Sequence, residues 1–581
     1  YTLSLHDALP ICPPGQTPTI FRPRPRLSYR PSCRPTAENS RSHDDIRPSS
    51  GYRIISVKRL MLLLTDVYRN HHKTSPKCEP NFSFPSQLEK FQGLGTTLTV
   101  VCGNCDFVSE NHAMFDTVRL PGHSVDQRPL AAEPNVRLAL WHLSHAPSFT
   151  DTRSATAFLD LPGISQKSLG NLVKKLEAPM RELGNDTLKD NCDLIKNVAN
   201  LLDQPTIAVA TDTCYNNPSK GQFYSLNGTQ CTTPMCELLT EKKLTLALNS
   251  LSQICTCPSR KLSEPCHCAA NVEPGRPISC QEGGAARENV LKIEGHGLVI
   301  GEVVCDGTHQ VMSLLKDKTI KKQECNVHRN RGVRRKVFQL APKLSDSCKL
   351  SSQFQIKMLA DELAHRCSAE LTWARRLFRD DKKLVKHLRR VRATIVPCLA
   401  GNHTFCRFGS LVCNWRNRRS RKLLNGLHAL NLTNEDQKIL QEAVNYKFND
   451  DMIIKQIGCY DTNKVEAFHQ RTLRLNPKSK LNKVTFHARN FHTVTLERKG
   501  LYEGTIALLN KVGLVGCPVA LKTLRDIARK KTYDAARQKS IKFKQSRHMM
   551  RNKKHKLRHI CSLNTETQRG TTKDHKNYTK Y

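Results

Sequence analysis

Residues 298–306 read LVIGEVVCD, a short and mostly apolar run that ends in a cysteine and an aspartate. An apolar run of this length predicts a buried β-strand. Residues 206–212 (TIAVATD) repeat the pattern, with β-branched and small apolar residues followed by an aspartate. Carboxylates that follow a strand face out of the sheet, where a site can form. Asp212 and Asp306 are therefore candidate functional residues.

A third carboxylate, Glu466, lies near the first turn of a predicted helix, NKVEAFHQRTL. Three such groups can hold two Mg²⁺ (or Mn²⁺) ions about 4 Å apart, which suits in-line attack on a phosphodiester. Magnesium favours a few carboxylates together with waters and phosphate oxygens. The pattern alone has low specificity, because the chain contains 51 acidic residues. On that pattern alone, a turn or capping role is the simpler interpretation of Asp212.

The chain is strongly basic. Its 581 residues include 92 Lys and Arg against 51 Asp and Glu, a formal net charge of +41. A field of this sign attracts polyanions, of which nucleic acid is the commonest, and an anionic membrane surface is the competing interpretation. The closest approach to a membrane span, residues 60–64, is far shorter than the roughly 20 apolar residues required. We therefore expect an intracellular protein without a membrane segment.

Composition and hydrophobic pattern divide the chain into seven segments. Capping-box spacing between Thr433 and Asp436 predicts the start of one helix in the longest helical stretch. The segments are 1–11, which resembles a translated sequencing adapter; 12–80, a disordered Pro/Arg/Ser-rich basic segment; 81–205, a Cys-containing and helical N-terminal module; 206–330 and 456–500, the two parts of an α/β core; 331–455, a helical insertion; and 501–581, a basic C-terminal tail.

The 24 cysteines favour thiolate–metal sites over disulfides in a reducing compartment, although many free cysteines are simply small buried apolar residues. Cys102 and Cys105 are at most half of a zinc site, since tetrahedral zinc needs four ligands, and His112 is a candidate third ligand. A second group lacks the usual spacing of a zinc finger and is the weaker candidate. It comprises Cys255, Cys257, Cys266, His267, Cys268 and Cys280.

Five stretches of the sequence occur in an order that resembles the Mutator-like transposase domain of eukaryotic mobile elements. The resemblance covers about 135–480 and implies a ribonuclease-H-like mixed sheet interrupted by a mainly helical insertion. The sequence departs from the family at residues 213–215 (TCY), where a glycine and an aromatic residue are frequent. The stretches are TIAVATDTCYNN (206–217), VVCDGTHQ (303–310), QECNVHRNRGVRRK (323–336), NHTFCRFGSLVCNW (402–415) and NKVEAFHQRTLRLNPKSK (463–480).

The resemblance assigns the family's acidic triad to Asp212, Asp306 and Glu466, and its Cys-x-x-His motif to Cys325 and His328. His309 and His469, each three residues after a triad member, could assist proton transfer. For both, a plain polar neighbour is the stronger interpretation.

Cys325 and His328 are also a half-site for zinc, whose other half would be His403 with Cys406, or Cys413. Zinc there would pin the helical insertion against the core and hold the third carboxylate in position, a structural role. The alternative is a hydrogen-bonded histidine on a basic surface beside a buried cysteine.

Three functions fit the sequence. The first is a nuclear DNA transposase that cleaves phosphodiesters with Mg²⁺ and transfers strands, acting as an oligomer on transposon ends and target DNA. The second is a catalytically inactive, transposon-derived DNA-binding protein stabilised by zinc. The third is a ribonuclease-like or RNA-binding protein that uses the same basic surface. All three employ the basic runs at 329–336, 375–392 and 416–422, whose positive charge suits phosphate-backbone contact.

Overall fold

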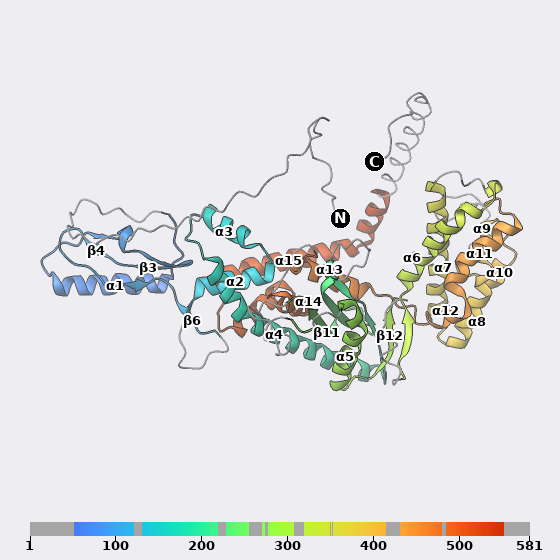
Figure 1. The fold of residues 1–581 in the computed structure, drawn as a ribbon, viewed down its shortest axis with the longest axis horizontal. Coiled ribbons are helices and arrows are strands. Elements are labelled where there is room, and N and C mark those ends of the chain that lie inside the picture. Colours follow the sequence, from blue (N-terminus) through green and yellow to red (C-terminus); the bar gives the residue numbers. More distant parts are fainter. Residues whose placement is uncertain are drawn as a thin grey trace, which may run out of the picture.

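The computed structural model describes residues 51–120, 130–218, 228–254, 270–272, 277–306, 319–348, 350, 353–413, 430–478, 484–550 and 553. Along its long axis, an N-terminal module, a central α/β core and a helical insertion follow one another (Figure 1). None of the helices in these residues is long and apolar enough to cross a membrane.

The core is built on a mixed sheet with the strand order β11-β10-β8-β12-β13, and β9 pairs with the far end of β10. Strand β10 is antiparallel to β8, β9 and β11, whereas β8, β12 and β13 are mutually parallel. The sheet therefore has an antiparallel and a parallel half that meet at β8. The strands are β8 (Ile207–Thr211), β9 (Cys214–Pro218), β10 (Gly228–Glu237), β11 (Thr245–Ser252), β12 (Ile300–Cys305) and β13 (Lys321–Glu324).

Helices cover both faces of this sheet, and the strand residues alternate between them with the expected period of two. Val209 and Val303 face α4 (Gln166–Leu201) and α5 (Glu282–Gly295), where they join one buried cluster. Their neighbours Ala210 and Val304 face the other way, against Val465 of α13 (Asn463–Leu475). The long helix α14 (Phe486–Lys511) packs along α4 and β11.

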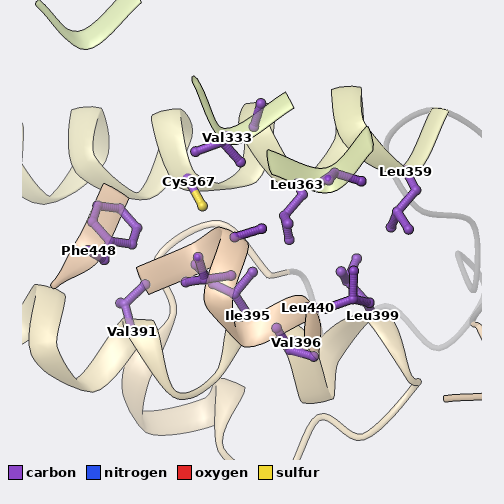
Figure 2. Packing of buried hydrophobic residues seen from close by; sticks show 14 of the residues in the cluster. Val333, Leu359, Leu363, Cys367, Val391, Ile395, Val396, Leu399, Leu440 and Phe448 are labelled. Carbon is purple, nitrogen blue, oxygen red and sulfur yellow. The ribbon is translucent and has the colours of Figure 1, made fainter. Parts of the chain in front are cut away.

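The helical insertion has a hydrophobic core of its own, as the labelled side chains in Figure 2 show. The capping box between Thr433 and Asp436 is confirmed at the start of α11. Leu384, Leu388 and Val391 are fully buried on one face of α8, whereas Leu377 at the end of α7 is 60% exposed. The helices are α6 (Asn326–Leu340), α7 (Gln353–Leu377), α8 (Asp381–Arg392), α9 (Ile395–Leu399), α10 (Cys406–Gly409), α11 (Asn434–Phe448) and α12 (Asp450–Ile454).

The N-terminal module differs from expectation, because part of the segment predicted to be disordered, 12–80, forms helix α1 (Val57–Thr74). Leu63, Val67 and His71 lie four residues apart on one face of α1 and are buried. The remaining elements of the module are short: β1 (Phe82–Ser83), β2 (Lys90–Gln92), β3 (Gly95–Leu98), β4 (Val101–Cys102), β5 (His112–Ala113), β6 (Thr117–Val118), β7 (Ala131–Ala132), α2 (Glu133–His145) and α3 (Phe149–Phe158).

Two segment boundaries also differ from expectation. Helix α4 was assigned to the N-terminal module, but its last turns bury Cys192, Ile195 and Ala199 against the core sheet. At the other end, the core extends past residue 500, because α14 continues to Lys511 and Leu508 packs with α4. The tail then forms α15 (Pro518–Lys539).

Candidate carboxylate site and metal centres

The two aspartates leave the sheet side by side. Strands β8 and β12 are adjacent and parallel, and Val304 pairs with Ala210. Asp306 and Asp212 lie two residues beyond this pair, just past the ends of their strands. Neighbouring strands are about 4.8 Å apart, so the two carboxylates emerge side by side at the same edge of the sheet.

Glu466 reaches this edge from the other side. It lies in the first turn of α13, directly after Val465, which is buried against the ends of β8 and β12. Burial and the nearby charges of Asp306 and Glu466 raise the pKa of Asp212 to about 6, whereas the Thr213 amide and His328 act against the rise. Asp306 and Glu466 are thus both close enough to Asp212 to influence its titration, although burial is the largest cause of the raised pKa.

Positive groups line the same site. Arg331 Nη2 lies 3.7 Å from Glu466 Oε1. His328, one turn earlier on α6, is hydrogen-bonded to the Cys325 thiol, and this bond together with the charges of Asp306 and Asp212 raises its pKa. The Arg331 guanidinium therefore offsets part of the repulsion between the carboxylates.

Cys325 joins three elements at this site. It caps the N-terminus of α6, and its amide donates to the Cys305 carbonyl at the end of β12. Its Sγ lies 3.2 Å from Thr462 Oγ1 and accepts a hydrogen bond from the Thr462 amide. Burial would raise the pKa of the thiol, but hydrogen bonds from His328 and Thr462 outweigh it and lower the pKa. The Cys-x-x-His pair thus couples α6 to the start of α13.

A fourth carboxylate, Glu282, belongs to this site and carries no sequence signal that identifies it. It is the first residue of α5, and the side chains of Thr213 and Tyr215 donate hydrogen bonds to it. Burial and the charges of Asp212 and Asp306 raise its pKa. Glu282 reaches the carboxylate site because α5 packs on the sheet, and this packing cannot be recognised from the local sequence.

The histidines near the triad residues, and the tryptophans beside the basic runs, differ in how the structure places them. His469 is buried on α13, and burial lowers its pKa to about 4, so that it is uncharged at neutral pH. Trp373 is 54% exposed, and Arg376 lies over its ring. His309 and Trp415 fall outside the described residues, as does the Cys/His group between 255 and 268.

The insertion contains a compact Cys/His cluster made by Cys398, His403, Cys406 and Cys413, whose ligand atoms all lie within 4.8 Å of one another. His403 Nδ1 is 3.5 Å from both Cys398 Sγ and Cys413 Sγ, and these two sulfurs are 3.6 Å apart. Zn–S bonds of about 2.3 Å and Zn–N bonds of about 2.0 Å set tetrahedral edges of about 3.5–3.8 Å. The arrangement fits zinc.

This cluster differs from the predicted set of ligands. His403 and Cys406 are included as expected, together with Cys413 and the unpredicted Cys398. Cys325 and His328 are not in it, because they lie at the carboxylate site instead. A separate cluster joins Cys102 and Cys105 to His71 and Cys78. The candidate third ligand, His112, is not in that cluster and lies on strand β5.

Comparison with known proteins gives one family. A family model described as Mutator-like transposase matches residues 51–413, more than half of the chain. The matched range contains Asp212, Asp306 and both Cys/His clusters, whereas Glu466 lies beyond it. No curated protein matches the sequence.

Proposed function

The chain belongs to the Mutator-like transposase family, and we propose that it is a DNA transposase whose catalytic residues are Asp212, Asp306 and Glu466. In this proposal the protein cleaves phosphodiesters at the ends of its element and transfers the strands to target DNA, in the nucleus and as an oligomer on paired ends. The main support for the proposal is the position of two aspartates at the ends of adjacent parallel strands. Asp306 and Glu466 also contribute to the raised pKa of Asp212, which indicates that the three carboxylates lie near one another.

A ribonuclease-H-like core is part of the proposal. It is supported by the mixed sheet, whose antiparallel and parallel halves meet at the strand that precedes Asp212. It is also supported by the helical insertion, which leaves the sheet after β13 and returns just before α13. This arrangement allows Asp212 and Glu466, which are 254 positions apart in the sequence, to share one site.

The carboxylates of Asp212, Asp306 and Glu466 would hold Mg²⁺ or Mn²⁺, hard cations that prefer oxygen ligands. When bound, two such ions would activate a water or 3′-hydroxyl and stabilise the leaving oxygen. The chain itself supplies a preformed acidic edge and keeps the group on α13 in register with the strands through Val465. The positive charge of Arg331 stabilises the acidic edge beside Glu466.

The Cys398–His403–Cys406–Cys413 cluster is proposed to hold a structural Zn²⁺. It would fasten the end of α9 to the segment that follows α10. That segment is also held by Glu370, which accepts hydrogen bonds from Ser410 Oγ and the Leu411 amide. A tetrahedral site with four protein ligands leaves no open position for substrate, so its role is structural.

The test is Mg²⁺-dependent nicking of a supercoiled plasmid that carries the element's ends, by purified wild type and by Asp306→Asn. Loss of a metal ligand removes several kcal/mol of transition-state stabilisation, so we expect nicking to fall roughly a hundredfold or more. Asp190→Asn, an exposed aspartate on α4, is the matched control and should nick as wild type does. Equal nicking by wild type and Asp306→Asn would contradict the assignment.

A zinc-stabilised, catalytically inactive DNA-binding protein is the second candidate, favoured by the two Cys/His clusters. It predicts DNA binding by wild type and Asp306→Asn with equal affinity, and no nicking by either. The same plasmid assay, run beside a binding assay, therefore separates the two functions.

A further inference from the structure

The N-terminal module contains a second Cys/His cluster, distant from the carboxylate site in the sequence. His71 comes from the last turn of α1, Cys78 from the turn that follows it, Cys102 from β4, and Cys105 from the next turn. Their four ligand atoms lie within 4.8 Å of one another, and all three cysteines are free thiols. We propose that these four residues bind a structural Zn²⁺ ion.

The spacing of the ligand atoms is that of a tetrahedral zinc site. Cys78 Sγ and Cys102 Sγ are 3.8 Å apart, and Cys105 Sγ is 3.4 Å from His71 Nε2. Tetrahedral Zn²⁺ with bonds of about 2.3 Å to sulfur and about 2.0 Å to nitrogen sets edges of about 3.8 Å and 3.5 Å. A disulfide needs sulfurs about 2.05 Å apart, so the thiols do not form one in this arrangement.

The groups around the ligands hold them in position. The Asn81 amide donates to Cys102 Sγ at 3.5 Å, and the Asn81 carbonyl accepts from the Gly103 amide at 2.7 Å. The ring of His71 lies edge-on between Phe82 and Phe107, with centroids 5.1 Å and 5.2 Å away. Amide–sulfur hydrogen bonds and a fixed imidazole orientation are what a thiolate–imidazole metal site requires of its surroundings.

The small hydrophobic core of the module is a second argument for a bound metal. Its hydrophobic cluster has five buried residues with five partly buried ones packed against them, and its strands are two to four residues long. The part of the module that holds the cluster, 51–120, is about 70 residues long; a domain of about 60 residues buries only about 60% of the surface that its unfolded chain exposes, so domains of this size are marginally stable and often use a disulfide or a metal. The Cys/His cluster links the end of α1 to the region of β4. It therefore adds to the hydrophobic contacts that hold these two parts together. The core residues are Leu63, Val67, Leu98, Val100 and Met114.

The first test measures the zinc content of the full-length protein by mass spectrometry after exhaustive dialysis. We expect Cys105→Ser and His71→Asn each to lose about one equivalent of zinc per chain relative to wild type. His72→Asn, on the next position of the same helix and exposed, should lose none. Cys413→Ser should lose a different equivalent, so that Cys105→Ser combined with Cys413→Ser loses about two. Unchanged zinc in both Cys105→Ser and His71→Asn would overturn the proposal.

A second test needs no variant and so survives misfolding of a substituted module. Amide hydrogen exchange of the wild-type chain is compared before and after chelation of zinc. We expect exchange in α1 and β3–β5 to rise at least tenfold, while α4 and β8 keep their protection. Unchanged exchange in α1 after zinc has been removed would overturn the proposal. Neither test depends on whether the protein cleaves DNA.

Discussion

Asp212 shows what the carboxylate site requires. Burial and the neighbouring carboxylates raise its pKa to about 6, so without a cation the folded protein keeps this carboxyl protonated to a higher pH than the unfolded chain does. The folded pKa lies above the ordinary value of 3.8, so this group contributes stability below that value. The contribution is lost as pH rises through about 6. A metal ion would supply the missing counter-charge, and it must compete with this proton.

That competition predicts a pH dependence for the proposed reaction. At a Mg²⁺ concentration below saturation, nicking should fall as pH drops through about 6, because protonated Asp212 is a poor ligand. Tenfold more Mg²⁺ should move the midpoint to lower pH, since metal and proton exclude each other. Plasmid nicking between pH 5 and 8 at two Mg²⁺ concentrations measures this shift. If the pH midpoint of nicking were the same at both Mg²⁺ concentrations, the titrating group would not be a ligand of the metal.

Glu282 gives a second prediction at the residue scale. Its charge lies beside Asp212 and Asp306, so Glu282→Gln should weaken the apparent affinity for Mg²⁺. The loss should be roughly fivefold to tenfold, because about 1 kcal/mol of attraction to a divalent ion is removed even in a water-like dielectric. The Mg²⁺ dependence of nicking measures it. Glu294→Gln, at the other end of α5, should keep the wild-type affinity.

Local signals in the sequence predicted some elements and not others. The strands that end before Asp212 and Asp306, and the capping box at Thr433, were predictable because their cues lie within a few residues. Helix α1 was missed, because its short apolar stripe adjoins a Pro/Arg/Ser-rich segment whose composition is typical of disorder.

The site was predictable only in part for a related reason. The Cys-x-x-Cys spacing of Cys102 and Cys105 indicates a half-site for a metal, but His71 joins them from a helix some 30 residues earlier. Glu282 likewise reaches the carboxylates only through the packing of α5. Contacts that depend on how elements pack leave no periodic trace in the sequence, so Cys398 too was absent from the predicted set of ligands.

The start of helix α11 carries a prediction at the element scale. Asp436 accepts hydrogen bonds from the amide and hydroxyl groups of both Ser345 and Thr433. Burial would raise its pKa, but these bonds outweigh it and hold the pKa well below the usual range. Asp436→Asn should therefore lower the local stability of α11 at pH 7 by about 1–3 kcal/mol.

Hydrogen exchange of the α11 amides measures this loss. Because the pKa of Asp436 is depressed, the stabilisation is present above its unfolded value of 3.8 and fades as pH falls below it. The difference between variant and wild type should shrink accordingly in acid. Asp450→Asn, which removes exposed ion pairs with Arg389 and Arg392, should change stability by less than about 0.5 kcal/mol. An equal effect of both substitutions would refute the role given to the buried cap.

At the scale of the whole molecule, part of the net charge of +41 lies on helix α15, which packs against α14. None of its residues, all of which the structure describes, is buried. Arg525 anchors it to α14 through a hydrogen bond to the Tyr502 hydroxyl. Against two acidic residues, Asp526 and Asp534, the helix carries Lys522, Arg525, Arg529, Lys530, Lys531, Arg537 and Lys539.

Such a helix should bind the phosphate backbone, and the salt dependence of DNA binding tests this. Each phosphate contact contributes about 0.9 to the slope of log K against log salt. Replacing Lys530, Lys531 and Lys539 with Gln should therefore reduce the slope by roughly 1 to 3 and weaken binding to unrelated DNA sequences equally. Three exposed lysines of α4, Lys167, Lys174 and Lys189, provide a control of the same charge change. If both triple variants lower the slope alike, the total charge of the chain binds DNA and α15 has no special part in it.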